Sequence, residues 1–203
     1  MPSHVTNGLG RQEDSVAYLL RHTQLLPRHL ILILNSIAVR SHDRTGGYRN
    51  FDAEQIVIGI REAERDIAEN VLSPWRTHNN ELLKCVERNF PDLPPIFALG
   101  EFQKVVRRFA KQLELDPHQI LSTLFQIGIL GRVTGAVPKE RDEQYAYAEF
   151  YFTTEDHGAF PTESSYCLHP IFSRYFGCTR QEKDDPRVVY PAITEGITLS
   201  DMI

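Results

Sequence analysis

The spacing of apolar residues changes near residue 128, and this change limits the possible folds more than any other feature of the sequence. Before it, apolar side chains recur every three or four positions, as on one face of a helix. The clearest run is Ile56, Ile60, Ala63, Ile67 and Val71. After it, two sets of side chains alternate over residues 145–152, as in a β-strand. We therefore predict a mainly α protein with a small β-wing.

Local start signals support the helices. Gln55 follows Asp52 by three residues, which is the spacing of a capping box. Asp116 and Pro117 have the residue types of an N-cap and a first helical position. The predicted helices cover residues 27–39, 52–71, 82–90, 101–113, 117–127 and 170–175, with a shorter segment from residue 14.

Strands are predicted over residues 96–99, 128–133, 145–152 and 166–169. Helix, strand, helix, helix, strand, long polar tip and strand is the element order of a winged helix, here over about residues 79–152. Pro74 interrupts the helical pattern ahead of it. We expect a helical domain over residues 14–78, a winged-helix domain over 79–176 and a C-terminal extension over 177–203. Residues 1–13 have no apolar period and are expected to be weakly ordered.

Composition excludes several classes of protein. A chain of 203 residues that is 41% hydrophobic can bury a core, so disorder is excluded. A net charge of −5 argues against a globally basic nucleic-acid binder, although residues 1–51 are locally basic. The longest apolar run, residues 30–34, is too short for a membrane span. Three cysteines without a signal peptide predict a cytoplasmic protein.

Two groups of short motifs resemble parts of a known family. The first is LRHTQLLPRHLI at residues 20–31, followed by Leu34 and Asn35. The second is IGILG at residues 127–131 with LHPIF at 168–172. They resemble the lid helix and the C-terminal winged helix of bacterial P-loop ATPases of the STAND and origin-recognition-like AAA+ type. Such ATPases are often encoded near mobile elements and defence genes, and the resemblance, over about residues 18–176, implies a lid-like helical bundle followed by a winged helix.

The ATPase core itself has no counterpart in this sequence. No segment fits G-x-x-x-x-G-K-[ST], and no strand ending in paired acids supplies a magnesium site. We therefore expect no ATP hydrolysis and no cofactor for this chain alone, with ATP involved only if it is joined to an ATPase core. The chain is either a piece of a larger ATPase or a free-standing relative, and the sequence leaves both open.

The resemblance also implies a role for Arg28, because lid helices of this type carry at that position an arginine that senses the nucleotide's γ-phosphate. A guanidinium presents a rigid fork of N–H donors that suits phosphate. Arg21 lies one helical stretch earlier and shares the implied nucleotide-sensing role. The alternative is a solvated arginine near a helix start.

A basic stripe is predicted on the helix over residues 101–113. It consists of Lys104, Arg107, Arg108 and Lys111, spaced i, i+3, i+4 and i+7. Such a stripe could bind duplex phosphates, contact an acidic partner or face solvent. Lys139 and Arg141 add positive charge to the nearly neutral polar tip. The helix over residues 117–127, which would enter a major groove, has no Lys or Arg, and this argues against sequence-specific readout.

Other candidate sites have structural alternatives. The eight histidines and three cysteines lack metal-site spacing. Cys167 and His169 could form a thiol–imidazole pair, or be a buried thiol beside a histidine that caps a proline-started helix. Tyr145, Tyr147 and Tyr151 could stack nucleic-acid bases, or pack across strands.

These features predict a non-catalytic regulatory and interaction module of a P-loop ATPase system, which docks to protein or duplex DNA through its winged helix. The expected partners are an ATPase core or another protein, or else duplex DNA, and a homo-oligomer is open. The alternative is an autonomous winged-helix DNA-binding regulator that dimerises through its helical half. An enzyme with an unrecognised site is a third reading, with no named residues.

Overall fold

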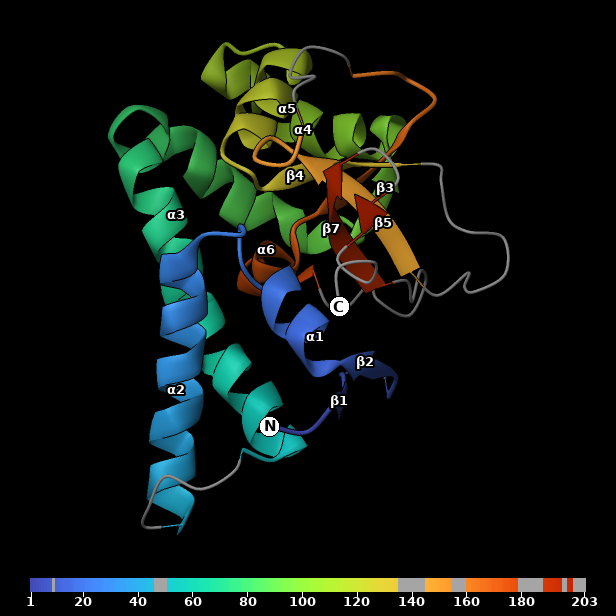
Figure 1. The fold of residues 1–203 in the computed structure, drawn as a ribbon. Coiled ribbons are helices and arrows are strands. Elements are labelled where there is room, and N and C mark those ends of the chain that lie inside the picture. The colour runs from blue at the N-terminus through green and yellow to red at the C-terminus, as the bar shows by residue number, and fades with distance from the viewer. Residues whose placement is uncertain are drawn as a thin grey trace.

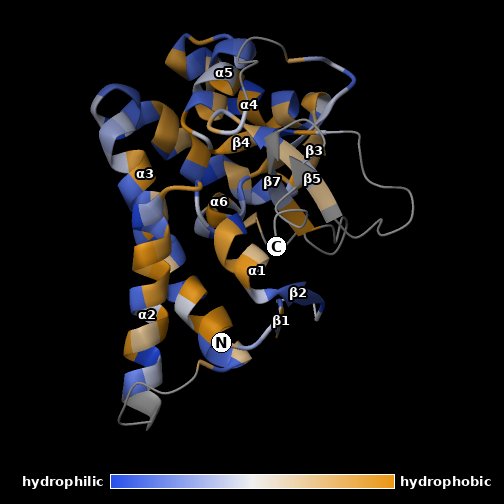
Figure 2. Ribbon diagram, in the orientation of Figure 1, coloured by the Kyte–Doolittle hydropathy of each residue, from blue (hydrophilic) through white to orange (hydrophobic). Residues whose placement is uncertain are grey.

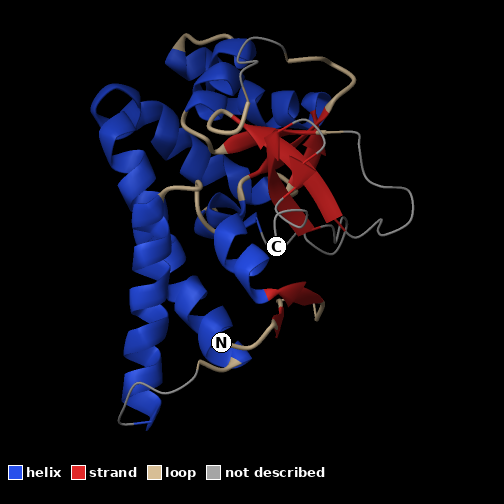
Figure 3. Cartoon of the chain, in the orientation of Figure 1, coloured by secondary structure: helices blue, strands red, loops and turns tan. Residues whose placement is uncertain are grey.

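A computed structural model describes residues 1–8, 10–45, 51–134, 145–154, 160–178, 188–194 and 197–198. The helices are α1 (Ser15–Arg21), α2 (Pro27–Thr45), α3 (Ala53–Asn89), α4 (Leu99–Leu113), α5 (Pro117–Gln126) and α6 (Pro170–Tyr175), with a 3₁₀ turn η1 (Phe90–Asp92). The strands are β1 (His4–Thr6), β2 (Gln12–Asp14), β3 (Ile96–Ala98), β4 (Leu130–Val133), β5 (Tyr145–Phe150), β6 (Ser165–Leu168), β7 (Val188–Thr194) and β8 (Ile197–Thr198). The described chain is thus mainly helical with a β-sheet at one end (Figures 1 and 3), as the sequence predicts.

The predicted helix starts are confirmed. Asp52 accepts a hydrogen bond from the backbone N–H of Gln55 at 2.7 Å, and Gln55 Oε1 accepts one from the Asp52 N–H at 3.0 Å. Asp116 caps α5, with Pro117 in its first turn. Helix α2 starts at Pro27 as predicted but runs to Thr45, so the predicted loop over residues 41–50 begins later than expected.

The predicted helices over residues 52–71 and 82–90 are the two ends of one bent helix, α3. The helix contains Pro74, and its backbone is non-helical at Asn79 (φ −123°, ψ 24°). Helices α2 and the first part of α3 pack side by side and project from the rest of the molecule (Figure 1). One hydrophobic cluster nevertheless includes both Ile60, in the first part of α3, and Phe172 of α6. The division into two domains stays a prediction.

The main sheet has the strand order β3-β6-β4-β5-β7, with β8 paired to β7. Strands β4 and β5 pair antiparallel, which confirms the predicted hairpin pairing. Strand β6 lies between β3 and β4, and β7 runs parallel to β5. The winged helix was predicted from an order of elements that includes neither β6 nor β7. The structure therefore shows an α-rich fold with a sheet, and the winged helix stays a prediction.

Strand β7 could not be predicted from the sequence, because consecutive residues of this strand are buried. Val188, Val189 and Tyr190 are 3–6% exposed, so the strand has no alternation of polar and apolar side chains. Its parallel pairing with β5 is also non-local, and no turn signal marks it. The rest of the predicted extension over residues 177–203 lies largely outside the described residues.

The expectation of weak order over residues 1–13 is wrong. Strands β1 and β2 form an antiparallel hairpin in which Val5 and Glu13 are buried. Polar contacts between Glu13 and the body of the protein hold this hairpin in place. The spacing of apolar residues gives no information about such contacts, so the hairpin was not predicted.

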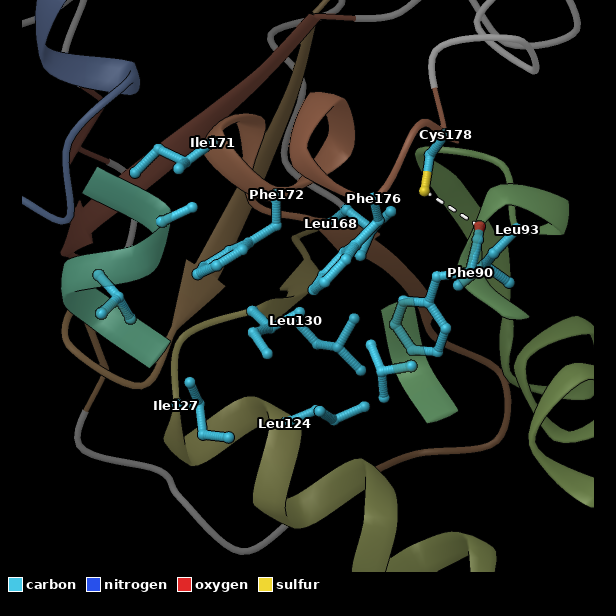
Figure 4. Close-up of a cluster of buried hydrophobic side chains, with 14 of the residues drawn as sticks. Phe90, Leu93, Leu124, Ile127, Leu130, Leu168, Ile171, Phe172, Phe176 and Cys178 are labelled. Carbon is cyan, nitrogen blue, oxygen red and sulfur yellow. Dashed lines mark hydrogen bonds between the residues drawn. The ribbon is translucent and has the colours of Figure 1, made fainter. Parts of the chain in front are cut away.

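A cluster of buried hydrophobic side chains joins the second part of α3 to the sheet and to α6 (Figure 4). Phe90 lies at its edge, and the Sγ of Cys178 donates to the Phe90 carbonyl at 3.0 Å. Phe172 and Phe176 of the α6 region stack in the same cluster, with ring centroids 5.7 Å apart. This packing fixes α6, whose opposite side contributes to the site described next.

Candidate functional site

The lid-like motif forms the joint between α1 and α2, and buried hydrogen bonds tie this joint to the C-terminal half. The Thr23 carbonyl lies 3.1 Å from Nε2 of His169. The side-chain amide of Gln24 donates to the Ile127 carbonyl at 3.2 Å, and the Gln24 backbone N–H donates to Nδ1 of His29 at 3.2 Å. Two of these hydrogen bonds attach the joint to the C-terminal half, and the third lies within the joint.

Arg28 is exposed in the first turn of α2. It makes no hydrogen bond or ion pair with another residue in the described ranges. Its charge acts on its neighbour: burial and the adjacent Arg28 lower the pKa of His29 to about 4. The guanidinium is thus available to a partner.

Arg21 is placed differently, because it is buried against Glu13. The guanidinium Nε lies 2.8 Å from Oε2 of Glu13, and Nη2 lies 3.1 Å from Oε1. Its Cζ also lies 4.8 Å from the centre of the Tyr18 ring. Of the two arginines to which the resemblance assigns nucleotide sensing, Arg21 is occupied by an internal ion pair and Arg28 is exposed.

The Glu13 carboxylate contacts residues from three parts of the chain. Besides Arg21, its carboxylate accepts hydrogen bonds from the Asn7 amide at 2.6 Å and from the Tyr190 hydroxyl of β7. Burial raises the pKa of Glu13, but the charge of Arg21 and these hydrogen bonds outweigh it and hold the pKa below its usual value. The two terminal regions of the described chain thus meet at one buried carboxylate.

A second buried carboxylate, Glu64 of α3, lies between His22 and Arg174. Nδ1 of His22 is 2.7 Å from Oε1 of Glu64. Nε of Arg174 is 3.0 Å from Oε2. Burial and the nearby charge of Arg21 lower the pKa of His22 although Glu64 opposes the shift, so the imidazole is neutral at pH 7.

His22, Glu64 and Arg174 line a cavity of about 90 Å³, whose walls come from α1, α3, α6, β7 and neighbouring segments. His22 and Glu64 are only 6% and 3% exposed, whereas the Arg174 side chain is 45% exposed. Sequence reasoning missed this site. The available signal was Glu64, a charged residue four positions after Ile60 on the apolar face of its helix.

The basic stripe is present on the exposed surface of α4, where all four of its side chains are exposed. Arg108 pairs with Asp92 of η1. Lys104, Arg107 and Lys111 have no ion pair with any other residue that the structure describes. Lys139 and Arg141 lie outside the described residues.

The structural alternatives account for Cys167, His169 and Tyr147, whereas Tyr151 is 40% exposed. His169 caps α6 by accepting the Ile171 N–H at Nδ1, 3.3 Å away, while Cys167 is buried with its Sγ 3.8 Å from the Gly131 carbonyl. This confirms the predicted cap of a proline-started helix. Tyr147 is buried against Tyr190, with ring centroids 6.1 Å apart, so it packs across strands.

Within the described residues, no group of three or more His, Cys, Asp and Glu side chains is placed to hold a metal ion. None of the helices described is both long and apolar enough to cross a membrane. No protein-family model matches the chain, and no curated protein or solved structure matches it. The resemblance to P-loop ATPases therefore stays a prediction.

Proposed function

We propose that this chain is a non-catalytic regulatory and interaction module of a P-loop ATPase system. The observation that carries the proposal is the exposed Arg28 on a joint fixed by buried hydrogen bonds. A guanidinium that completes a nucleotide site in another domain must reach outward from a rigid support, because phosphate recognition depends on geometry. Thr23, Gln24 and His29 are all buried and provide that support.

Exposed apolar side chains beside Arg28 also support a docking role. Leu26, Ile31 and Leu34 are 37%, 56% and 37% exposed, on the joint and the first half of α2. Large apolar side chains grouped on a surface are typical of protein contacts. Figure 2 shows the corresponding hydrophobic bands along α2, a helix that lies at the outside of the molecule.

We further propose that the C-terminal half is a winged helix extended by β6 and β7, and that it docks through α4. The order β3, α4, α5, β4, β5 and the β4–β5 pairing support this interpretation. Lys104, Arg107 and Lys111 form a cationic face suited to an acidic protein surface. Because α5 has no Lys or Arg, we favour a protein partner over duplex DNA.

Site-directed photo-crosslinking in a lysate of the source cells tests the proposal. A photo-crosslinking amino acid replaces the exposed Ile31, one turn from Arg28, and in a control chain it replaces Arg65, which is exposed on α3. We expect position 31 to capture a protein with a P-loop ATPase core, more strongly with a non-hydrolysable ATP analogue, and Arg28→Ala to reduce this capture. Equal capture at both positions, or no P-loop protein at position 31, would contradict the proposal.

A further inference from the structure

Two arginines line the cavity beside α6, and both keep N–H donors that no other residue uses. Arg21 donates to Glu13 from Nε and Nη2, at 2.8 Å and 3.1 Å, and its Nη1 has no hydrogen-bond partner among the described residues. Nε of Arg174 lies 3.0 Å from Glu64, and its terminal nitrogens make no hydrogen bond within the described chain. A guanidinium has five N–H donors in a rigid fork. Several donors of each arginine are therefore available to an occupant of the cavity.

The guanidinium groups are accessible, whereas the carboxylates beside them are covered. The side chains of Glu13 and Glu64 are 0% and 4% exposed. The Arg174 side chain is 45% exposed, and Nη1 of Arg21 keeps some accessible surface. The two carboxylates reduce the positive charge of the site, but only the guanidinium nitrogens can form hydrogen bonds with an occupant. Since the cavity is not closed at Arg174, an entering anion also keeps part of its hydration, which limits the cost of burying its charge.

The two arginines act on the same part of the cavity. Cζ of Arg21 lies 4.8 Å from the centre of the Tyr18 ring, and Tyr18 lines the cavity. Burial raises the pKa of Tyr18, and the charges of Arg21 and Arg174 both oppose this increase. Both guanidinium groups are thus within electrostatic range of one hydroxyl. Leu168 and Val188 supply uncharged wall. Guanidinium donors directed at a shared space are suited to an oxyanion, because they form short, charge-assisted hydrogen bonds with it.

The volume of the cavity limits the size of the occupant. It is about 90 Å³, which is about three times the ~30 Å³ that one water occupies in the liquid. Such a space holds a group of about three to five non-hydrogen atoms. We propose that the cavity binds a single oxyanion group, a phosphate or a carboxylate, through Nη1 of Arg21 and the terminal nitrogens of Arg174. The proposal is independent of docking through Arg28 or α4.

Titration of the whole chain with inorganic phosphate and with acetate, against chloride at the same ionic strength, tests this proposal. We expect a saturable rise in Tm with at least one of the two oxyanions, since binding to the folded state stabilises it. The more effective of the two identifies the preferred group. In ¹⁵N spectra of the wild type, the side-chain resonances of Arg21 and Arg174 should shift along the same titration.

Substitutions then show where the anion binds. Arg174→Gln removes one guanidinium and should weaken binding at least about tenfold, because hydrogen bonds to charged groups are strong. Arg174→Lys keeps a positive charge beside Glu64 but loses the fork, so it should retain part of the affinity. Arg88→Gln, a matched change at an exposed arginine of α3, should bind like the wild type. Circular dichroism shows whether each variant keeps its fold.

Three outcomes would overturn the proposal. The first is the absence of any saturable effect of phosphate or acetate beyond that of chloride. The second is a rise in Tm that does not saturate, because excluded salts stabilise proteins in this way without binding a site. The third is saturable binding that Arg174→Gln leaves unchanged or that does not shift the Arg21 and Arg174 resonances of the wild type, since the anion would then bind elsewhere, for example on α4.

Discussion

At the scale of single residues, Arg21 and Arg28 differ in environment although they lie in one motif. Arg21→Met leaves the Glu13 carboxylate buried without its cation, so we expect the free energy of unfolding to fall by about 3–5 kcal/mol. Urea unfolding measures this loss. In Glu13→Gln/Arg21→Met the loss should be smaller than the sum of the two single losses, because no lone charge stays buried. Additive losses would show that the pair is not coupled.

Arg28→Ala should behave in the opposite way. Its side chain is exposed and has no described partner, so unfolding free energy should change by less than about 0.5 kcal/mol. The same urea experiment checks this expectation. A loss above 1 kcal/mol would indicate a structural role and weaken the proposal that Arg28 serves a partner.

Local signals at single residues were readable from the sequence, and distant pairings were not. Asp52, Asp116 and His169 act on residues two or three positions away, so residue type and spacing predicted their caps. Glu13 and Tyr190 meet across almost the whole chain. No local pattern encodes that contact, and the cavity that depends on such pairings was missed for the same reason.

At the scale of elements, α2 and α3 pack so closely that Gly59 has no room for a side chain. A Cβ there would lie 2.5 Å from Cγ1 of Ile37 and 2.9 Å from its Cα. Gly59→Ala should therefore lower the unfolding free energy by about 1–3 kcal/mol, despite the higher helix propensity of alanine. The control is Gly100→Ala in α4, where the added methyl meets nothing within 4 Å and should stabilise by about 0.4–1 kcal/mol. Equal effects of the two changes would mean that α2 and α3 are not in this contact.

DNA binding by the charged face of α4 distinguishes the two candidate functions, the interaction module and the DNA-binding regulator. We expect generic duplex DNA to bind weakly and only at low salt, because three exposed cations give non-specific attraction. Arg107→Glu/Lys111→Glu should reduce this weak binding, and the matched pair Arg61→Glu/Arg65→Glu on α3 serves as the charge control. Tight binding near 150 mM salt with a steep salt dependence, lost only in the α4 variant, would instead support the autonomous DNA-binding regulator.

Elements whose apolar residues recur at a regular spacing were predicted well. The sheet was predicted only in part. Helices α4 and α5 carry amphipathic patterns and clear starts, and β4 and β5 follow one another along the chain. Strand β7 is buried on consecutive residues and pairs in parallel with a strand about forty positions earlier. Burial on both faces removes the alternation that reveals a strand, so the sheet could be placed only as far as β6.

At the scale of the whole molecule, three buried histidines link the joint, the cavity and α6, and they make stability depend on pH. Burial lowers the pKa of His169 to about 3 and that of His29 to about 4, and the pKa of His22 is lowered as well. In the unfolded chain these groups titrate near 6.5. The unfolded state therefore binds more protons than the folded state below that pH.

Stability should consequently be complete above pH ~6.5 and fall as the pH is lowered toward the folded pKa values. Each such histidine contributes up to ~1.4 kcal/mol per pH unit. Urea unfolding between pH 7.5 and 4.5 measures the slope. His29→Asn keeps an acceptor for the Gln24 N–H but cannot titrate, so its slope should be shallower than that of the wild type, whereas replacement of the exposed His118 by Asn should leave the slope unchanged. A flat profile in the wild type would mean that these histidines are accessible to protons in the folded state, and the tight joint on which the role of Arg28 depends would then be absent in solution.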